Sequence, residues 1–261
     1  MKVMDANELY DPEFRELIKS KKPTVIIPVG SLEQHGAHLP ITTDSDIVTE
    51  VASRLAKKCG FIVFPTINYG VSFEHEPLFS ISISKAILKA HLKKIVESLM
   101  NNGIRSVIIL NGHHGNRKTI DNFADEWWDN DLMQQTAKKE WKDAGLDPKT
   151  IGNKPLVKCE CYHYWDSKFL NHEFDHAGFV ETSIMLAISD KVKMKKAKKG
   201  LITKGMSEKE IQRIKKLSTE SGGFPKVAKN GVWGDPTGAT KKDGEKFLAE
   251  IVSNLAKECQ S

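Results

Sequence analysis

Four side chains that commonly bind divalent metals lie close together in one short segment. Glu33, His35, His38 and Asp44 follow the apolar run at residues 24–29, in a loop that precedes a helical pattern. Carboxylate and imidazole ligands without a thiolate suit zinc, manganese or iron. A metal with an open coordination position can ionise a bound water near neutral pH. The segment therefore predicts a metal-dependent hydrolase.

The surrounding pattern indicates which elements must position these side chains. Short apolar runs bounded by glycine or proline predict buried strands, and apolar stripes at helical spacing predict helices. We expect strands at 24–29, 61–64, 105–110 and 156–162, and helices at 46–58, 85–101, 179–188 and 240–257, the last capped by Thr240. This alternation predicts an α/β fold, a three-layer α-β-α sandwich with a mainly parallel central sheet.

Ligands of such sheets bind beyond the carboxyl ends of the strands. The segment with Glu33 follows the first predicted strand, and Asn111-Gly-His113 follows the third, so the two loops should converge on one edge. We expect a single domain over residues 1–261, with a tryptophan-rich helical insertion at 123–150. The insertion could pack on the parent domain, line a substrate entrance or make a subunit contact.

The order and spacing of these motifs resemble the creatininase family. The matching segments are Gly30–Pro40, Asp44, Asn111–His113 and His176–Ser183, within similarity that runs from residue 23 to 186 and resumes at 231–240. The resemblance implies a metal-dependent amidohydrolase that is often hexameric. It places metal ligands at Glu33, His35, Asp44 and His113, with Asp44 able to bridge two metals.

Two further residues extend this site by resemblance. His176 matches a histidine used for proton transfer, although it could instead cap a helix. Glu181 lies in an apolar helical segment, where an acid is costly unless it is paired or ligated, so it is a candidate fifth ligand and catalytic group. It could also be an acceptor that orients a ligand histidine. We expect His38 to brace the loop.

The substrate-binding positions match the family only in part. Trp165 is a candidate stacking wall, and Glu74 and His75 lie in a segment that borders the family's active site. His114 and His172 stand where creatininase has aromatic residues, and Gly115 stands where it has a metal-binding glutamate. One or two divalent metals, zinc or manganese with iron possible, therefore remain open, and creatinine itself is disfavoured as the substrate.

Three functions remain open from the sequence. The leading hypothesis is cleavage of a C–N bond in a small cyclic amide or formamide by metal-activated water. The first alternative is ring opening of a keto-inositol of the 3-dehydro-scyllo-inosose type at a C–C bond, for which the extra histidines would suit a hydroxyl-rich substrate. The second alternative is a non-catalytic metal-binding scaffold.

The bulk composition excludes several partner classes. The net charge of +5 is modest, and the lysine runs at 191–199 and 209–216 contain no aromatic residue, which argues against nucleic-acid binding and favours solvated faces. No apolar run is long enough to span a bilayer and no signal-peptide pattern begins the sequence, so we expect a cytoplasmic protein without a membrane partner. The four scattered cysteines suit reduced thiols. The expected partners are a small-molecule substrate and, by resemblance, further copies of this chain in a homo-oligomer, a hexamer.

Overall fold

The computed structural model describes residues 4–121, 123, 142–143, 157–173 and 175–260. Its central sheet has five strands: β1 (Met4–Asp5), β4 (Ile62–Val63), β2 (Thr24–Val29), β6 (Ser106–Asn111) and β7 (Lys158–His163). They lie in the order β1-β4-β2-β6-β7, and every pair is parallel. The expected parallel sheet is confirmed.

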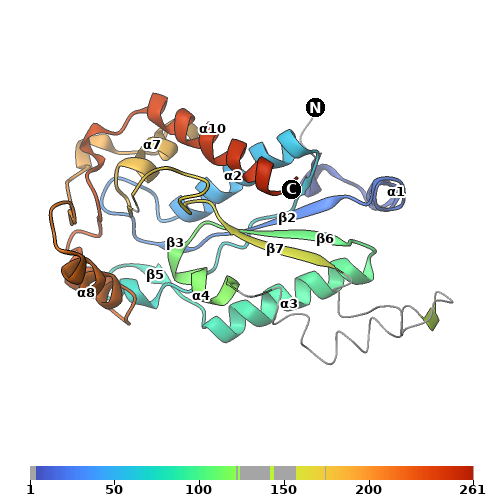
Figure 1. Ribbon diagram of the computed structural model, residues 1–261, viewed down its shortest axis with the longest axis horizontal. Coiled ribbons are helices and arrows are strands. Elements are labelled where there is room, and N and C mark those ends of the chain that lie inside the picture. The colour runs from blue at the N-terminus through green and yellow to red at the C-terminus, as the bar shows by residue number, and fades with distance from the viewer. Residues whose placement is uncertain (1–3, 122, 124–141, 144–156, 174, 261) are drawn as a thin grey trace.

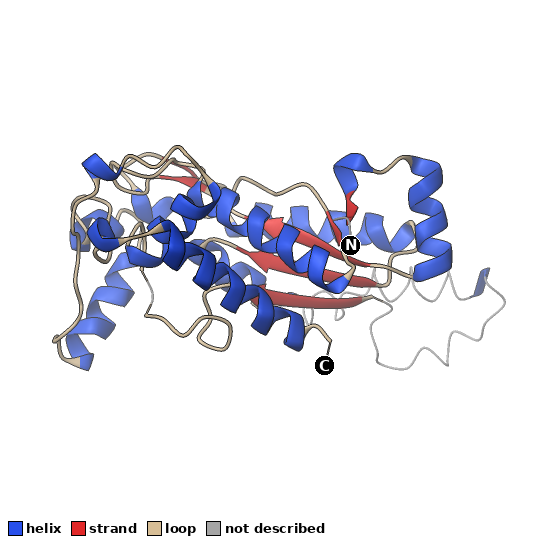
Figure 2. Cartoon of the chain, turned by 90° about the horizontal axis from the view of Figure 1, so that it is seen from above, coloured by secondary structure: helices blue, strands red, loops and turns tan. Residues whose placement is uncertain are grey.

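Helices cover both faces of this sheet, as Figures 1 and 2 show. One layer consists of α2 (Thr43–Cys59), α7 (Phe179–Ile188) and α10 (Lys241–Glu258), and the other is led by α3 (Lys85–Asn101). Alternate residues of β2 point to opposite faces, so Ile26 joins the core under α2, α7 and α10, whereas Val25 and Ile27 join the core over α3. Each such buried aliphatic side chain contributes about 1.5–3 kcal/mol to folding. The predicted three-layer sandwich is therefore confirmed.

Shorter elements surround these layers. The helices are α1 (Asp11–Lys21), α4 (Arg117–Ile120), α8 (Glu208–Ser218) and α9 (Phe224–Val227), and the turns of 3-10 helix are η1 (Ala6–Glu8), η2 (Phe73–His75), η3 (His114–Asn116), η5 (Met194–Lys196) and η6 (Pro236–Gly238). Strands β3 (Leu32–Glu33) and β5 (Ser80–Ile81) form a separate antiparallel pair. None of the described helices combines the length and apolar character that crossing a membrane requires.

The expected helix at 46–58 begins earlier than the sequence suggested. Helix α2 begins at Thr43, so Asp44 lies in its first turn and not in the preceding loop. The Thr43 hydroxyl donates to the carbonyl of Pro40, and the carboxylates of Asp44 and Asp46 favour the positive end of the helix dipole. Helix geometry, and not a flexible loop, therefore fixes Asp44.

The structure also bears on the predicted helix bounds, the insertion and the cysteines. Helices α3 and α7 have the predicted bounds, and Thr240 caps α10 by accepting a hydrogen bond from the amide of Asp243. The insertion expected at 123–150 falls largely outside the described residues. All four cysteines are free thiols.

Candidate active site

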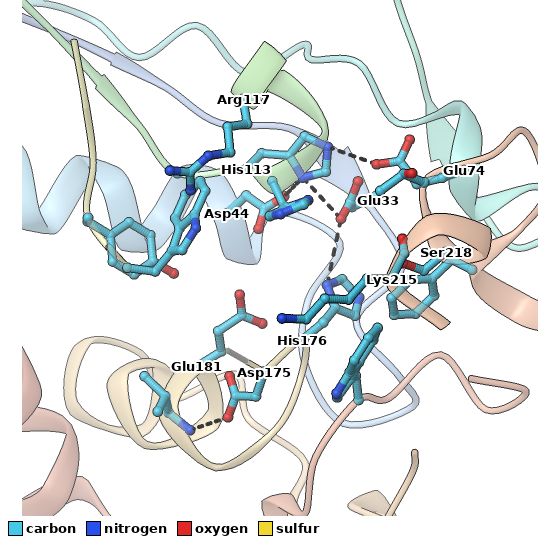
Figure 3. A pocket seen from close by; sticks show the side chains of 18 of the residues that line it. Glu33, Asp44, Glu74, His113, Arg117, Asp175, His176, Glu181, Lys215 and Ser218 are labelled. Carbon is cyan, nitrogen blue, oxygen red and sulfur yellow. Dashed lines mark hydrogen bonds and ion pairs between the residues drawn. The ribbon is translucent and has the colours of Figure 1, made fainter. Parts of the chain in front are cut away.

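A cavity of about 310 Å³ lies at the carboxyl ends of β2 and β6, where the parallel register sets Val29 beside Asn111. Figure 3 shows side chains from several separate segments converging on it. Apart from His35 and His38, every candidate residue from the sequence lines this cavity: Glu33, Asp44, Glu74, His75, His113, His114, Trp165, His172, His176 and Glu181. His35 is fully buried directly behind it.

The Asp44 carboxylate joins two histidines from different loops. Its Oδ1 lies 3.2 Å from Nε2 of His35, and its Oδ2 lies 3.0 Å from Nδ1 of His113. Glu33 adds Oε1 at 3.3 Å from the same nitrogen of His113. A carboxylate with one oxygen toward each histidine has the arrangement expected of a ligand shared by two ions.

Backbone carbonyls fix the second nitrogen of each of these histidines. His35 places Nδ1 at 3.1 Å from the carbonyl oxygen of Glu33, and His113 places Nε2 at 2.8 Å from that of Val71. If these nitrogens donate, the neutral tautomers turn lone pairs toward the carboxylates of Glu33 and Asp44. Metal-binding histidines are oriented in this way.

The electrostatics of this cluster require a cation. Both carboxylate oxygens of Glu33 and Oδ2 of Asp44 are buried without a hydrogen bond. Burial opposes charge on these groups, but the neighbouring His113 and His75 outweigh it and hold the pKa of Glu33 well below its usual range. Although burial disfavours a charged imidazole, the Asp44 carboxylate raises the pKa of His35 to about 10. Protons or divalent ions must therefore balance the acids, and the mixed donor set fits a divalent metal.

His176 and His75 flank Glu33 in different ways. Nε2 of His75 lies 3.1 Å from Oε1 of Glu33, and the Gln34 amide donates to its other nitrogen. His176 places Nε2 3.1 Å from the carbonyl oxygen of Gln34, to which it can donate, and turns Nδ1 toward Glu33 at 3.9 Å. Burial, reinforced by His35 and His75, holds the pKa of His176 well below its ordinary value. His176 is thus a neutral base that faces the cluster.

Glu181 lies on the opposite side of His35, in the first turn of α7. Its Oε2 accepts a hydrogen bond of 2.6 Å from the amide of Ala177 and lies 3.7 Å from Nε2 of His35. Ala177 has a positive φ of 52°, a left-handed conformation that turns its amide toward this carboxylate. Burial raises the pKa of Glu181 to about 8, against the opposing charge of His35. His35, His176 and Glu181 form a compact group that could hold a metal ion.

Gly115 shows why the missing glutamate cannot simply be restored. A Cβ atom built there would lie 2.1 Å from the carbonyl oxygen of Val71 and 2.4 Å from Oε1 of Glu74. Glu74, from a different loop, therefore fills the space that a side chain at position 115 would enter. Its Oε1 lies 3.7 Å from Nε2 of His113, on the side of the ring that faces away from Asp44. Glu181 instead approaches the same His35 nitrogen as Asp44, at 3.7 Å against 3.2 Å.

The remaining candidates lie farther from the carboxylates. Trp165 is half-buried, with its ring centroid 6.2 Å from that of His114. His172 is exposed at the entrance, stacked on Phe179 at 6.0 Å. His38 lies outside the cavity, where its Nε2 is 3.0 Å from the hydroxyl of Thr182, so it connects the loop to α7.

The structure adds residues that the sequence reasoning did not single out. Arg117, Tyr164, Asp175 and Lys215 also line the cavity. Lys215 belongs to the lysine run interpreted as a solvated face, and one member of that run instead points into the cavity (Figure 3). Ser207 and Glu210 form a capping box that could have predicted α8, but no local signal places that helix over the cavity.

Fold and site together define a hydrolase whose centre combines carboxylates and imidazoles at one edge of a parallel sheet. The family model described as creatinine amidohydrolase matches residues 7–259, and the chain belongs to this creatininase family.

Relatives within the family carry different names. The chain is 31% identical over 248 residues to the mycofactocin precursor peptide peptidase of Mycolicibacterium smegmatis, across 92% of this chain and 85% of that protein. It is 41% identical over 105 residues, 38% of this chain and 43% of the other, to a 2-amino-5-formylamino-6-ribosylaminopyrimidin-4(3H)-one 5'-monophosphate deformylase of Methanosphaera stadtmanae.

Solved creatininase structures share the fold. One superposes with a TM-score of 0.73 at 23% identity, covering 99% of this chain and 97% of that one. A manganese form of creatininase gives a TM-score of 0.71 at 22% identity, covering 98% and 97%.

Proposed function

We propose that this protein hydrolyses a C–N bond in a small amide, cyclic amide or formamide other than creatinine, with one or two divalent metal ions. Zinc or manganese suits the donor set best, and iron is a further candidate. Glu33, His35, Asp44, His113 and Glu181 would hold the ions. The observation that carries this proposal is the position of Asp44. Its two carboxylate oxygens face His35 and His113, whose other ring nitrogens lie against backbone carbonyls.

Different groups of the chain would bind the metal, transfer a proton and orient the proton-transfer histidine. A bound divalent metal would supply an ionised water and polarise the substrate carbonyl. His176, neutral and with Nδ1 toward the centre, can take up a proton and return it to the leaving nitrogen. The hydrogen bond from Nε2 of His176 to the backbone carbonyl of Gln34 orients the ring so that Nδ1 faces the centre.

The nature of the bond is supported by the relatives. The names peptidase, deformylase and amidohydrolase all describe hydrolysis of a carbon–nitrogen bond. The cavity of about 310 Å³ suits a small substrate or one end of a larger one. Trp165 offers a flat wall, but His172 stands where creatininase has its second tryptophan, so the argument for a creatinine ring is weak.

Elemental analysis combined with activity tests this proposal. The purified protein is loaded with manganese or zinc, desalted, and compared with Asp44→Asn and the control Asp46→Asn, which alters a neighbouring carboxylate outside the cavity. We expect one or two ions per chain in the wild type and in Asp46→Asn. Asp44→Asn should lose at least one ion and slow hydrolysis roughly a thousandfold, because several kcal/mol of charge stabilisation disappear.

The activity panel contains formamides, lactams, short peptides and a keto-inositol. Turnover of the keto-inositol alone would replace C–N cleavage by the ring-opening alternative. A wild-type protein that retains no metal, or an Asp44→Asn variant that retains both metal and activity, would overturn the proposed site.

A further inference from the structure

The side chain of Lys215 places a positive charge at the cavity. Lys215 lies in the last turn of α8 and extends its side chain into the cavity, as Figure 3 shows. Among the residues that the structure describes, its amine makes no ion pair or hydrogen bond. A lysine amine that points into a binding cavity without a protein partner is available to a ligand.

The other cation at the cavity is already balanced. Arg117 donates from Nη1 to Oδ1 of Asp166 at 2.8 Å, and its Nε lies 3.8 Å from Oδ2 of Asp121. Six acids also line the cavity, and none of these described residues forms an ion pair with Lys215: Glu33, Asp44, Glu74, Glu173, Asp175 and Glu181. Lys215 is therefore the cation that remains for a substrate group within the described part of the cavity.

Packing fixes the helix that carries Lys215. The neighbouring Ile214 packs against the small apolar cluster around Phe224 and Trp233. Phe224 in turn contacts the rings of His75 and His176, with centroids 4.6 and 4.7 Å away. The same apolar cluster thus supports both the proposed proton-transfer histidine and the helix that presents Lys215.

We propose that the substrate carries an anionic group, a carboxylate or a phosphate, and that Lys215 binds this group while the scissile amide lies at the Asp44 cluster. This inference rests on the proposed function and narrows its substrate class to acidic amides. The role of Lys215 is recognition, so its removal should reduce affinity for acidic ligands selectively.

Matched hydroxamates test this selectivity, because a hydroxamate group binds divalent metals and its tail can be varied. Binding of three probes to the manganese-loaded protein is measured by calorimetry: succinic monohydroxamate, its neutral terminal amide, and a hydroxamate with a phosphonate tail. We expect at least one acidic probe to bind about tenfold or more tightly than the amide, as a hydrogen bond to a charged group provides.

Variants assign that preference to one side chain. Lys215→Met should abolish the acid-over-amide ratio, Lys215→Arg should restore part of it, and the control Lys216→Met, at an exposed neighbour outside the cavity, should keep it. An equal affinity for acidic and neutral probes, or a ratio that survives in Lys215→Met, would overturn the proposal. Failure of all hydroxamates to bind would instead remove the proposed metal site, and this inference with it.

The two tails separate the possible sources of the anion. A preference confined to the carboxylate probe identifies an amide-bearing acid or a peptide terminus as the substrate. A preference confined to the phosphonate probe identifies a phosphate ester. Both results support recognition by Lys215.

Discussion

At the scale of single residues, the centre contains buried carboxylates whose negative charge must be balanced by a cation. Neither carboxylate oxygen of the fully buried Glu33 forms a hydrogen bond, yet imidazoles surround it. Because the outer nitrogens of His35 and His113 are fixed by backbone carbonyls, both rings are oriented before any ligand arrives. Such preorganisation lets binding energy be used for holding an ion and not for ordering side chains.

Gly115 provides a first test at this scale. Gly115→Ala should lower the free energy of unfolding by about 1–3 kcal/mol, because the new methyl group meets the carbonyl of Val71 and the carboxylate of Glu74. Urea denaturation measures the change. The matched control is Gly238→Ala, where a Cβ atom has nothing within 4 Å. Equal stability of both variants would contradict the tight packing inferred around Glu74.

The burial of His38 predicts that the free energy of unfolding depends on pH. Burial, with a smaller effect of His35, lowers its pKa to about 4 from an ordinary value of 6.5. Between pH 6.5 and 4 the unfolded chain therefore binds a proton at His38 that the folded chain does not, and stability falls as the pH drops. The slope from this group is at most about 1.4 kcal/mol per pH unit.

The His38→Gln variant isolates this contribution, since glutamine can retain a hydrogen bond to Thr182. Unfolding free energies measured from pH 7 to 4 should fall less steeply in the variant than in the wild type. Parallel curves would mean that His38 is protonated equally in both states.

The sequence indicated which residue types gather at this site, but not how they are arranged. The motif around Glu33 and the one at His113 indicated metal ligands, and the structure brings them together with Glu181. The sequence could not show that Glu74 occupies the space beside Gly115, because that contact joins two loops. Nor could it distinguish Lys215 from the exposed lysines around it.

At the scale of elements, α10 holds α7 in place. Gly244 of α10 lies so close to α7 that a Cβ atom would stand 1.9 Å from the carbonyl oxygen of Ser183. The Ser183 hydroxyl also accepts a hydrogen bond from the amide of Thr240, the cap of α10. Because Glu181 lies on α7, the spacing between these two helices determines its position.

Gly244→Ala tests this contact, because the expected change in stability is opposite to that of most glycine-to-alanine substitutions in helices. Alanine in a helix interior is normally more favourable than glycine by about 1 kcal/mol, but here the clash should destabilise the protein by roughly 1–3 kcal/mol. Thermal unfolding gives the sign, and metal titration should show weaker binding as Glu181 moves. Lys242→Ala, an exposed substitution on the same helix, is the control. A stabilised Gly244→Ala variant would show that α7 and α10 can separate freely.

Elements with strong periodicity were predictable and those without it were not. The apolar pattern gave α3 and α7 their bounds because their buried faces repeat at helical spacing. The early start of α2 depends on Thr43 bonding to Pro40, which a search for apolar stripes does not detect. The position of α8 over the cavity depends on tertiary packing through Ile214.

At the scale of the whole molecule, an exposed apolar surface surrounds the β3–β5 pair. Its members are Ile41, Tyr69, Phe79 and Ile81, each 42–52% exposed. Backbone pairing joins their segments: the amide of Gln34 donates to Phe79, and Leu32 pairs with Ile81. A large exposed apolar group of this kind is typical of an association surface.

We expect this surface to join copies of the chain in a homo-oligomer. Light scattering after size-exclusion chromatography should give a multiple of the chain mass. The double variant Phe79→Glu/Ile81→Lys should reduce it to the monomer, and Met206→Glu, at an exposed apolar residue elsewhere, should not. A monomeric wild type would refute this assembly.

The order of the layers along the chain also has a consequence for biosynthesis. Asp44 and His113 are translated early, but Glu181 is held in position only after α10 has been made and has packed on α7. At 5–20 residues per second, the interval between Glu181 and the end of α10 lasts on the order of ten seconds. During that time the nascent chain holds an incomplete site, so the full group of carboxylates and imidazoles belongs to the finished fold and not to the emerging polypeptide.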